Sequence, residues 1–153
     1  MKYISLSLSI IFIVSCAGTL TTAEKDFEYQ KVYEVAGGKD TLFTKSLQWL
    51  AQTYTDSKEV IEYEDKEAGK IIGRGATQVM YNPLAISPIM LNIRYSIKID
   101  LKDNKARITF ANIYNPQSPA APIFVDTRDR LIPKFEALTE GYHQFLKSDD
   151  DNW

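Results

Sequence analysis

Catalysis and metal binding need side chains that this sequence holds in very small numbers. It has one histidine, His143, in a segment with helical periodicity, and one cysteine, Cys16, far from it in the chain. A serine–histidine–aspartate set would have to use His143, and no Gly-x-Ser-x-Gly motif is present. Histidine and cysteine form no cluster with zinc-ligand spacing, and the aspartates at 149–151 lack the pattern of a calcium loop. We expect no catalytic residue, no metal site and no cofactor.

Residues 62–75 contain the other candidates for a site. Three carboxylates adjoin a predicted turn and are expected to be solvated: Glu62, Glu64 and Asp65. Gly73-Arg74-Gly75 lies inside a predicted strand and opens no helix, so it differs from phosphate-binding glycine loops. Gly73 and Gly75 leave one face of that strand bare. Either a helix packs closely over them, or they form the floor of a ligand cleft between helix and sheet, together with Trp49.

The N-terminus has the pattern of a targeting segment. Met1-Lys2 gives a positive start, and residues 4–14 are apolar but too short to span a bilayer comfortably. The following Ile13-Val14-Ser15-Cys16 resembles the bacterial lipobox. The resemblance implies a lipoprotein signal peptide at residues 1–15, cleavage before Cys16, and acyl chains on Cys16 that anchor the protein in a membrane. An ordinary secretory leader with an incidental cysteine is the alternative.

The residues after Cys16 bear on its destination. Ala17 follows the cysteine where an aspartate would change sorting, which implies the outer membrane of a bacterial cell envelope. No acidic cluster comes directly after Cys16, so we expect the protein to face the periplasm. Residues 16–26 are small and polar and are predicted to be the lipidated cysteine and its tether.

Length and composition indicate one globular domain. The chain has 153 residues, of which 44% are hydrophobic and 25% charged, and its formal net charge is -2. It shows no basic stripe, so we expect no nucleic-acid partner. A single cysteine excludes an intramolecular disulfide. We predict a single domain at residues 27–148 and an acidic tail at 149–153.

A predicted hairpin, Leu91–Tyr114, is the element that must position any site. From 91 to 102 every odd residue is apolar and every even residue is polar, which indicates a strand with one face on a core. A loop centred on Asp103-Asn104 makes four cross-strand pairs: Leu101–Ala106, Ile99–Ile108, Ile97–Phe110 and Asp100–Arg107. The alternation shifts after Phe110, so a bulge is predicted near Ala111–Asn112.

Two amphipathic helices are predicted. Asp40 is placed to cap the first, whose apolar stripe also includes Leu42 and Trp49 beside its main members: Phe43, Leu47, Leu50 and Tyr54. Pro133 suits the first turn of the second. Its stripe comprises Leu131, Phe135, Leu138, Tyr142 and Phe145. Gly141 inside this helix indicates close packing against a neighbour.

The other strands are predicted at Phe27–Ala36, Lys58–Asp65 and Lys70–Tyr81. Two proline-containing loops flank the hairpin, at Asn82–Pro88 and Asn115–Arg130. Apolar residues in these loops are candidates for contact with a partner: Leu84, Ile86, Ile123 and Phe124. Together with Ile89 and Met90 they would make an exposed apolar patch.

The elements predict an α+β fold in the order β-α-β-β-β-β-α, with an antiparallel sheet of about five strands and two helices on one face. The segments Tyr63–Gly75, Ile93–Lys102 and Ala106–Ile113 resemble domain-of-unknown-function family 4468. That resemblance implies a TATA-binding-protein-like (TBP-like) fold and occurrence in exported bacterial lipoproteins. It brings no catalytic residues, and the fold by itself does not imply DNA binding.

The favoured hypothesis for function is a non-enzymatic module, anchored through Cys16, that binds a small ligand or an envelope protein. A structural protein whose edge strand or loops mediate assembly of the envelope is the alternative. A hydrolase that uses unrecognised residues is the third. A deep apolar cavity under the helices would favour ligand binding, and a flat apolar surface made by the loops would favour assembly.

Overall fold

The computed structural model describes residues 27–54, 60–81, 87–121, 123 and 125–148. Its strands are β1 (Tyr29–Glu34), β2 (Ile61–Asp65), β3 (Lys70–Tyr81), β4 (Ile89–Lys102) and β5 (Lys105–Tyr114). Its helices are α1 (Lys39–Thr53) and α3 (Val125–Lys147). The element order β-α-β-β-β-β-α is therefore as predicted. No helix among the described residues is long and apolar enough to cross a membrane.

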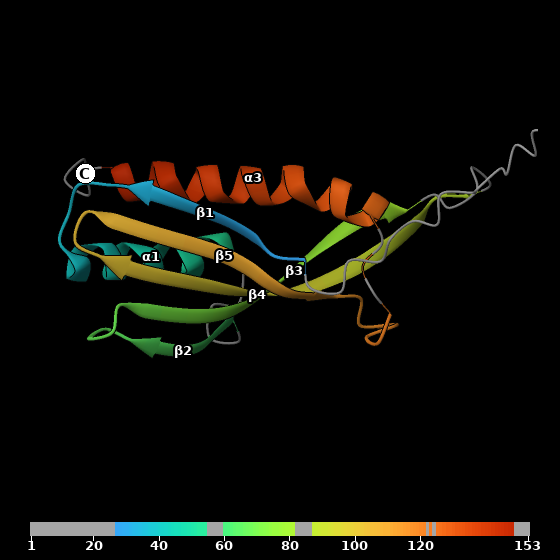
Figure 1. Ribbon diagram of the computed structural model, residues 1–153, viewed down its shortest axis with the longest axis horizontal. Coiled ribbons are helices and arrows are strands. Elements are labelled where there is room, and N and C mark those ends of the chain that lie inside the picture. Colours follow the sequence, from blue (N-terminus) through green and yellow to red (C-terminus); the bar gives the residue numbers. More distant parts are fainter. Residues whose placement is uncertain (1–26, 55–59, 82–86, 122, 124, 149–153) are drawn as a thin grey trace, which may run out of the picture.

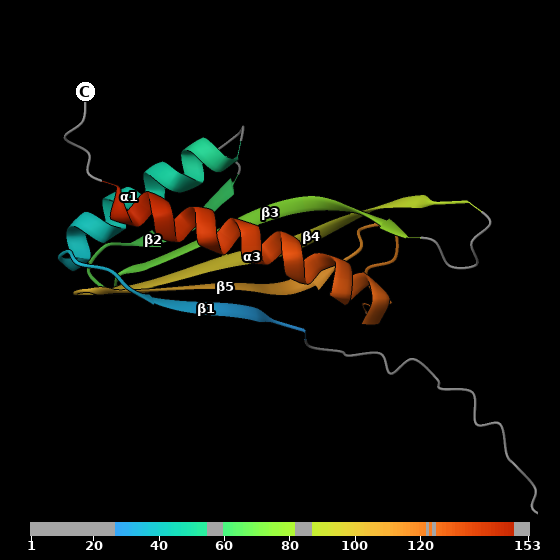
Figure 2. The ribbon, with the colours of Figure 1, turned by 90° about the horizontal axis from the view of Figure 1, so that it is seen from above.

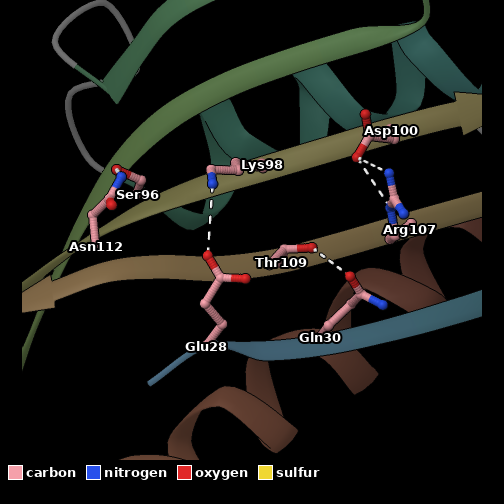
Figure 3. A network of polar contacts seen from close by, with 8 residues as sticks. All are labelled: Glu28, Gln30, Ser96, Lys98, Asp100, Arg107, Thr109 and Asn112. Carbon is pink, nitrogen blue, oxygen red and sulfur yellow. Dashed lines mark hydrogen bonds and ion pairs between the residues drawn. The ribbon is translucent and has the colours of Figure 1, made fainter. Parts of the chain in front are cut away.

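The strands form one antiparallel sheet in the order β1-β5-β4-β3-β2 (Figure 1). Both helices cover the same face of this sheet. Figure 3 looks onto the opposite face, with the helices beyond the strands. In Figure 2, α3 runs along the sheet, and β3 and β4 project beyond the other strands at one end. β5 ends opposite Arg94, while β3 continues alongside β4 as far as Ile89. We call the uncovered side of the sheet the open face.

The hairpin register is confirmed. All four predicted cross-strand pairs are present, and the odd residues of β4 from Ile93 to Leu101 are buried against the helices. The Arg107 side chain donates through Nε and Nη2 to Asp100 Oδ2, at 3.1 and 2.9 Å. The predicted bulge is also present, because the β4–β5 register shifts between Arg94 and Ser96 and Asn112 has φ 50°.

The cap of α1 differs from the prediction. Asp40 lies in the first turn but makes no capping hydrogen bond; it forms an ion pair with Lys66 at 3.5 Å. The helix N-terminus is instead held by the hairpin turn, where Asp103 Oδ1 accepts from the Lys39 backbone N–H at 2.8 Å. Asn104 Oδ1 accepts from the Gly37 N–H at 3.0 Å. The capping residues are therefore distant in sequence, and local pattern could not identify them.

α3 begins earlier than predicted. It starts at Val125, so Pro133 lies inside the helix rather than in its first turn. The last six residues of the predicted loop Asn115–Arg130 are therefore helical. Pro133 sits on the exposed side, where the carbonyl that loses its intrahelical donor can bond to water. The helix is held by the buried residues Leu131, Phe135, Tyr142 and Leu146, which continue its stripe on both sides of the proline.

Gly141 does not have the close packing that its position suggested. It is exposed, and a methyl group built on it would meet nothing within 4 Å among the described residues. The centre of the core is instead aromatic. Phe135 of α3 stacks on Phe110 of β5 with ring centroids 4.4 Å apart, and Tyr95 of β4 meets both rings edge-on.

Candidate functional site

The space above the two strand glycines is filled by the chain's own atoms. A methyl group on Gly75 would lie 2.3 Å from Cε2 of the Tyr95 ring, which leans across from the neighbouring strand. One on Gly73 would lie 2.8 Å from the Val60 carbonyl oxygen. The space directly above Gly75 is thus taken by a side chain of the sheet itself, and the space above Gly73 by the Val60 backbone, so neither glycine forms the floor of an open cleft among the described residues. Glycine leaves room for a cross-strand aromatic ring.

Trp49, the third member of the predicted cleft, belongs to the same closed region. It is buried and meets the Tyr54 ring edge-on at 6.3 Å, and the Tyr54 and Tyr95 hydroxyls are 3.2 Å apart. Burial raises the pKa of both tyrosines, so the pair is neutral and acts as a hydrogen-bonded part of the core. Trp49 and Gly75 are thus linked through Tyr54 and Tyr95, whereas Gly73 meets Val60.

The only histidine in the sequence lies on the surface of the helix layer. Its ring stacks on Tyr33 with centroids 4.2 Å apart, and Nδ1 is 3.9 Å from a Glu140 carboxylate oxygen. Among the described residues, no group of three or more histidine, cysteine, aspartate or glutamate side chains could hold a metal ion. His143 therefore serves as a packing partner of β1.

The described members of the predicted apolar patch differ in their exposure. Ile123 is buried, and it lines a pocket of about 200 Å³ together with Leu91, Ile93 and Thr127. Large apolar residues at the projecting end of β3 and β4 are half exposed: Met80 (52%), Ile89 (50%) and Met90 (53%). The other residues named for these sites, Leu84, Ile86, Phe124 and Cys16, lie outside the described residues.

The open face carries rows of polar side chains that run across the strands. One row passes from Val32 through Arg107 and Asp100 to Lys70. Figure 3 shows this face, with Lys98 and Glu28 3.8 Å apart and Thr109 bonded to Gln30 at 3.3 Å. The antiparallel register explains the second contact, because Gln30 of β1 and Thr109 of β5 are direct cross-strand partners.

A hollow of about 510 Å³ lies on the open face, at the end where the β2–β3 and β4–β5 turns meet α1. We call it the basic hollow. Its charged lining residues are Lys39, Lys70, Lys102, Lys105, Arg107 and Asp100, and Val32 adds an apolar wall. Sequence reasoning did not identify this site. The signal was available in the charged positions of the predicted hairpin, which are even-numbered in its first strand and odd-numbered in its second, but Lys39 and Lys70 join the hollow only through the fold.

Comparison with known proteins agrees with this architecture. The model of a domain of unknown function with a TBP-like fold, DUF4468, matches residues 29–115. A crystal structure of a DUF4468 family protein from Bacteroides ovatus aligns with a TM-score of 0.63 at 13% identity, covering 82% of this chain and 89% of that one. A TBP-like protein from Parabacteroides distasonis aligns with a TM-score of 0.56 at 16% identity, covering 79% and 92%. No curated protein matches the chain.

These identities show a shared fold and nothing further about function. The family model, however, spans β1 to β5 and covers more than half of the chain. The five-stranded antiparallel sheet, its two helices and its element order are those of TBP-like neighbours. The chain therefore belongs to the DUF4468 family of domains of unknown function with a TBP-like fold.

Proposed function

We propose that this protein is an envelope lipoprotein, anchored through Cys16, whose domain is a non-enzymatic binding module that uses its open face. The observation that carries the proposal is the contrast between the two sides of the sheet. The helix side is packed around Tyr95, Phe110 and Phe135 and leaves a pocket of about 200 Å³ beside Ile123, whereas the open face holds a hollow of about 510 Å³, a size suited to a small ligand.

An uncovered face is common in antiparallel sheets, and the basic hollow is what distinguishes this one. Five lysine or arginine side chains and one carboxylate line it, although the chain as a whole has a net charge of -2. Such local segregation of charge favours contact with an anionic partner. The cations cluster at one end of the sheet and form no stripe, so a nucleic acid is not proposed as the partner.

Lysine labelling in living cells tests the use of the open face. A membrane-permeable amine reagent is applied to cells that express the protein and to the purified full-length chain. We expect Lys70, Lys102 and Lys105, which line the hollow, to react about threefold more slowly in cells, as they would if a partner occupied about two-thirds of the molecules. Lys134 and Lys147, exposed on α3, serve as the control and should react equally in both. Equal reactivity of all five lysines would exclude the open face as an occupied surface.

Replacement of Cys16 tests the anchor. Cys16→Ala removes the thiol that would carry the acyl chains, each of which contributes about 0.8 kcal/mol per buried methylene. We expect the variant to incorporate no clickable palmitate analogue and to move from the membrane fraction to the soluble fraction. Ser15→Ala, which keeps the cysteine and a small residue before it, is the matched control. Undiminished labelling of Cys16→Ala would show that the lipoprotein assignment is wrong.

A structural role in envelope assembly is the second candidate. It is favoured by Met80 and Met90, which pair across β3 and β4 and are half exposed where these strands project. Methionine oxidation by dilute peroxide distinguishes the two functions. Protection of both methionines in cells, with the open-face lysines fully reactive, would favour assembly through the projecting end. The opposite result would favour binding at the basic hollow.

A further inference from the structure

The basic hollow contains more positive charge than its own carboxylate can neutralise. Arg107 is engaged, because its guanidinium donates to Asp100 from two nitrogens at 2.9 and 3.1 Å. The Lys39 ammonium donates to the Glu67 carbonyl oxygen at 2.6 Å, which holds it in place, and the nearby Asp65 carboxylate offsets part of its charge. The fold therefore sets the positions of these two cations before any ligand binds.

The remaining lysines are less constrained. Lys105 lies 3.7 Å from Glu34, and both side chains are at least half exposed. The side chains of Lys70 and Lys102 make no hydrogen bond or ion pair with the described part of the chain. Asp65, which pairs with Lys70 across the strands, is occupied by the Ala68 N–H at 2.8 Å and the Tyr63 hydroxyl at 3.1 Å. Both N–H and O–H contacts lower the pKa of Asp65, so it stays an acceptor for these donors.

Register adds an independent observation. Lys102 and Lys105 are direct cross-strand partners on either side of the Asp103-Asn104 turn. Like charges directly opposite each other destabilise an antiparallel pair. An anion between the two ammonium groups would remove this repulsion, and the same anion would lie within the hollow that Arg107 and Lys70 also line.

We infer that the basic hollow is a binding site for a phosphate ester. Ammonium and guanidinium groups together are the donors that proteins use for phosphate oxygens, and Arg107 is held in place by Asp100. Val32, which is 51% exposed, offers apolar contact to the organic part of such a ligand. The ester could belong to a soluble phosphorylated molecule or to the headgroup of an anionic lipid. This inference rests on the proposed use of the open face.

Calorimetry on the lipidated full-length protein in non-ionic detergent tests the site. Glycerol 3-phosphate represents the soluble source, and phosphatidylglycerol in mixed micelles represents the lipid source, with phosphatidylcholine as its control. We expect one of the two anions to bind with Kd below about 1 mM, and the double variant Lys70→Ala/Lys102→Ala to weaken it by about tenfold or more. Lys98→Ala, on the same face but outside the hollow, should bind like the parent.

The outcomes separate the inference from the proposed function. Weaker binding by the double variant, with an unchanged melting temperature of the free protein, supports the site. The anion that binds then shows whether the phosphate belongs to a soluble molecule or to a lipid. Absence of binding by either anion, or equal binding by parent and double variant, overturns the phosphate site. If the open-face lysines are nevertheless protected in cells, the open face remains a binding surface for another partner. If they react fully, the proposed function fails as well.

Discussion

Ile99→Asp is expected to unfold the domain. Ile99 is 1% exposed, and its cross-strand partners Ile71 and Ile108 are also fully buried. An aspartate there would place a carboxylate among aliphatic side chains with no donor to pair with it. The cost is on the order of 4 kcal/mol or more, a large part of a domain's typical total stability of about 5–15 kcal/mol. Urea denaturation followed by circular dichroism measures the loss.

Asn92→Asp is the matched control for this variant. It introduces the same side chain on the same strand, but on the open face, where the Gln78 amide now donates to Asn92 Oδ1 at 2.9 Å. A carboxylate oxygen can accept the same hydrogen bond, so we expect a change within about 0.5 kcal/mol. Comparable stability of Ile99→Asp and Asn92→Asp would mean that the odd face of β4 is not the core.

Gly75→Val is expected to destabilise the domain by about 2–3 kcal/mol, because the new side chain overlaps the Tyr95 ring. That ring cannot move away freely. It is buried, its hydroxyl is near that of Tyr54, and it meets Phe110 and Phe135 edge-on at 5.4 and 5.2 Å. Valine has a higher strand propensity than glycine, so without the overlap the substitution would stabilise the domain. The overlap with Tyr95 makes it destabilising. Chemical denaturation of the purified protein gives the change.

A double-mutant cycle identifies the cause of that loss. Tyr95→Ala removes the ring, so the cost of Gly75→Val should largely disappear in the Tyr95→Ala background, with a coupling energy of about 1 kcal/mol or more. Gly141→Ala is the contrasting glycine substitution. Its methyl group meets nothing within 4 Å, and we expect it to stabilise α3 by up to about 1 kcal/mol. Additive effects of Gly75→Val and Tyr95→Ala would contradict the contact.

Strands were predictable from the sequence where one face of the strand is buried and the other is exposed to solvent. β3 and β5 have the predicted bounds, and the β4–β5 register followed from a short turn and an unbroken alternation. Side-chain direction in a strand has a period of two, so a slip of one residue would bury Lys98 and Asp100. The bulge at Asn112 was predictable for the same reason, because a break in the alternation has to be accommodated locally.

Predictions that depended on contacts between distant segments were less successful. Asp40 has the residue type and position of a cap. The hydrogen bond at the helix N-terminus is instead made by Asp103, because the hairpin turn packs against that end of α1. Pro133 is typical of a first helical turn, yet burial of Leu131 and Thr127 extends α3 to Val125. In both cases tertiary packing outweighed a local preference of about 1 kcal/mol.

The candidate site also combines features that local sequence predicts with features that depend on contacts between distant segments. By itself the sequence determined the element order, the two faces of the hairpin and the scarcity of catalytic side chains, because these depend on residue type and short-range periodicity. Only the tertiary structure decided that Tyr95 closes the space over Gly75 and that Lys39 and Lys70 join the cations of the β4–β5 hairpin. Those outcomes depend on which strands become neighbours and on side-chain orientation across them, and no single segment encodes either one.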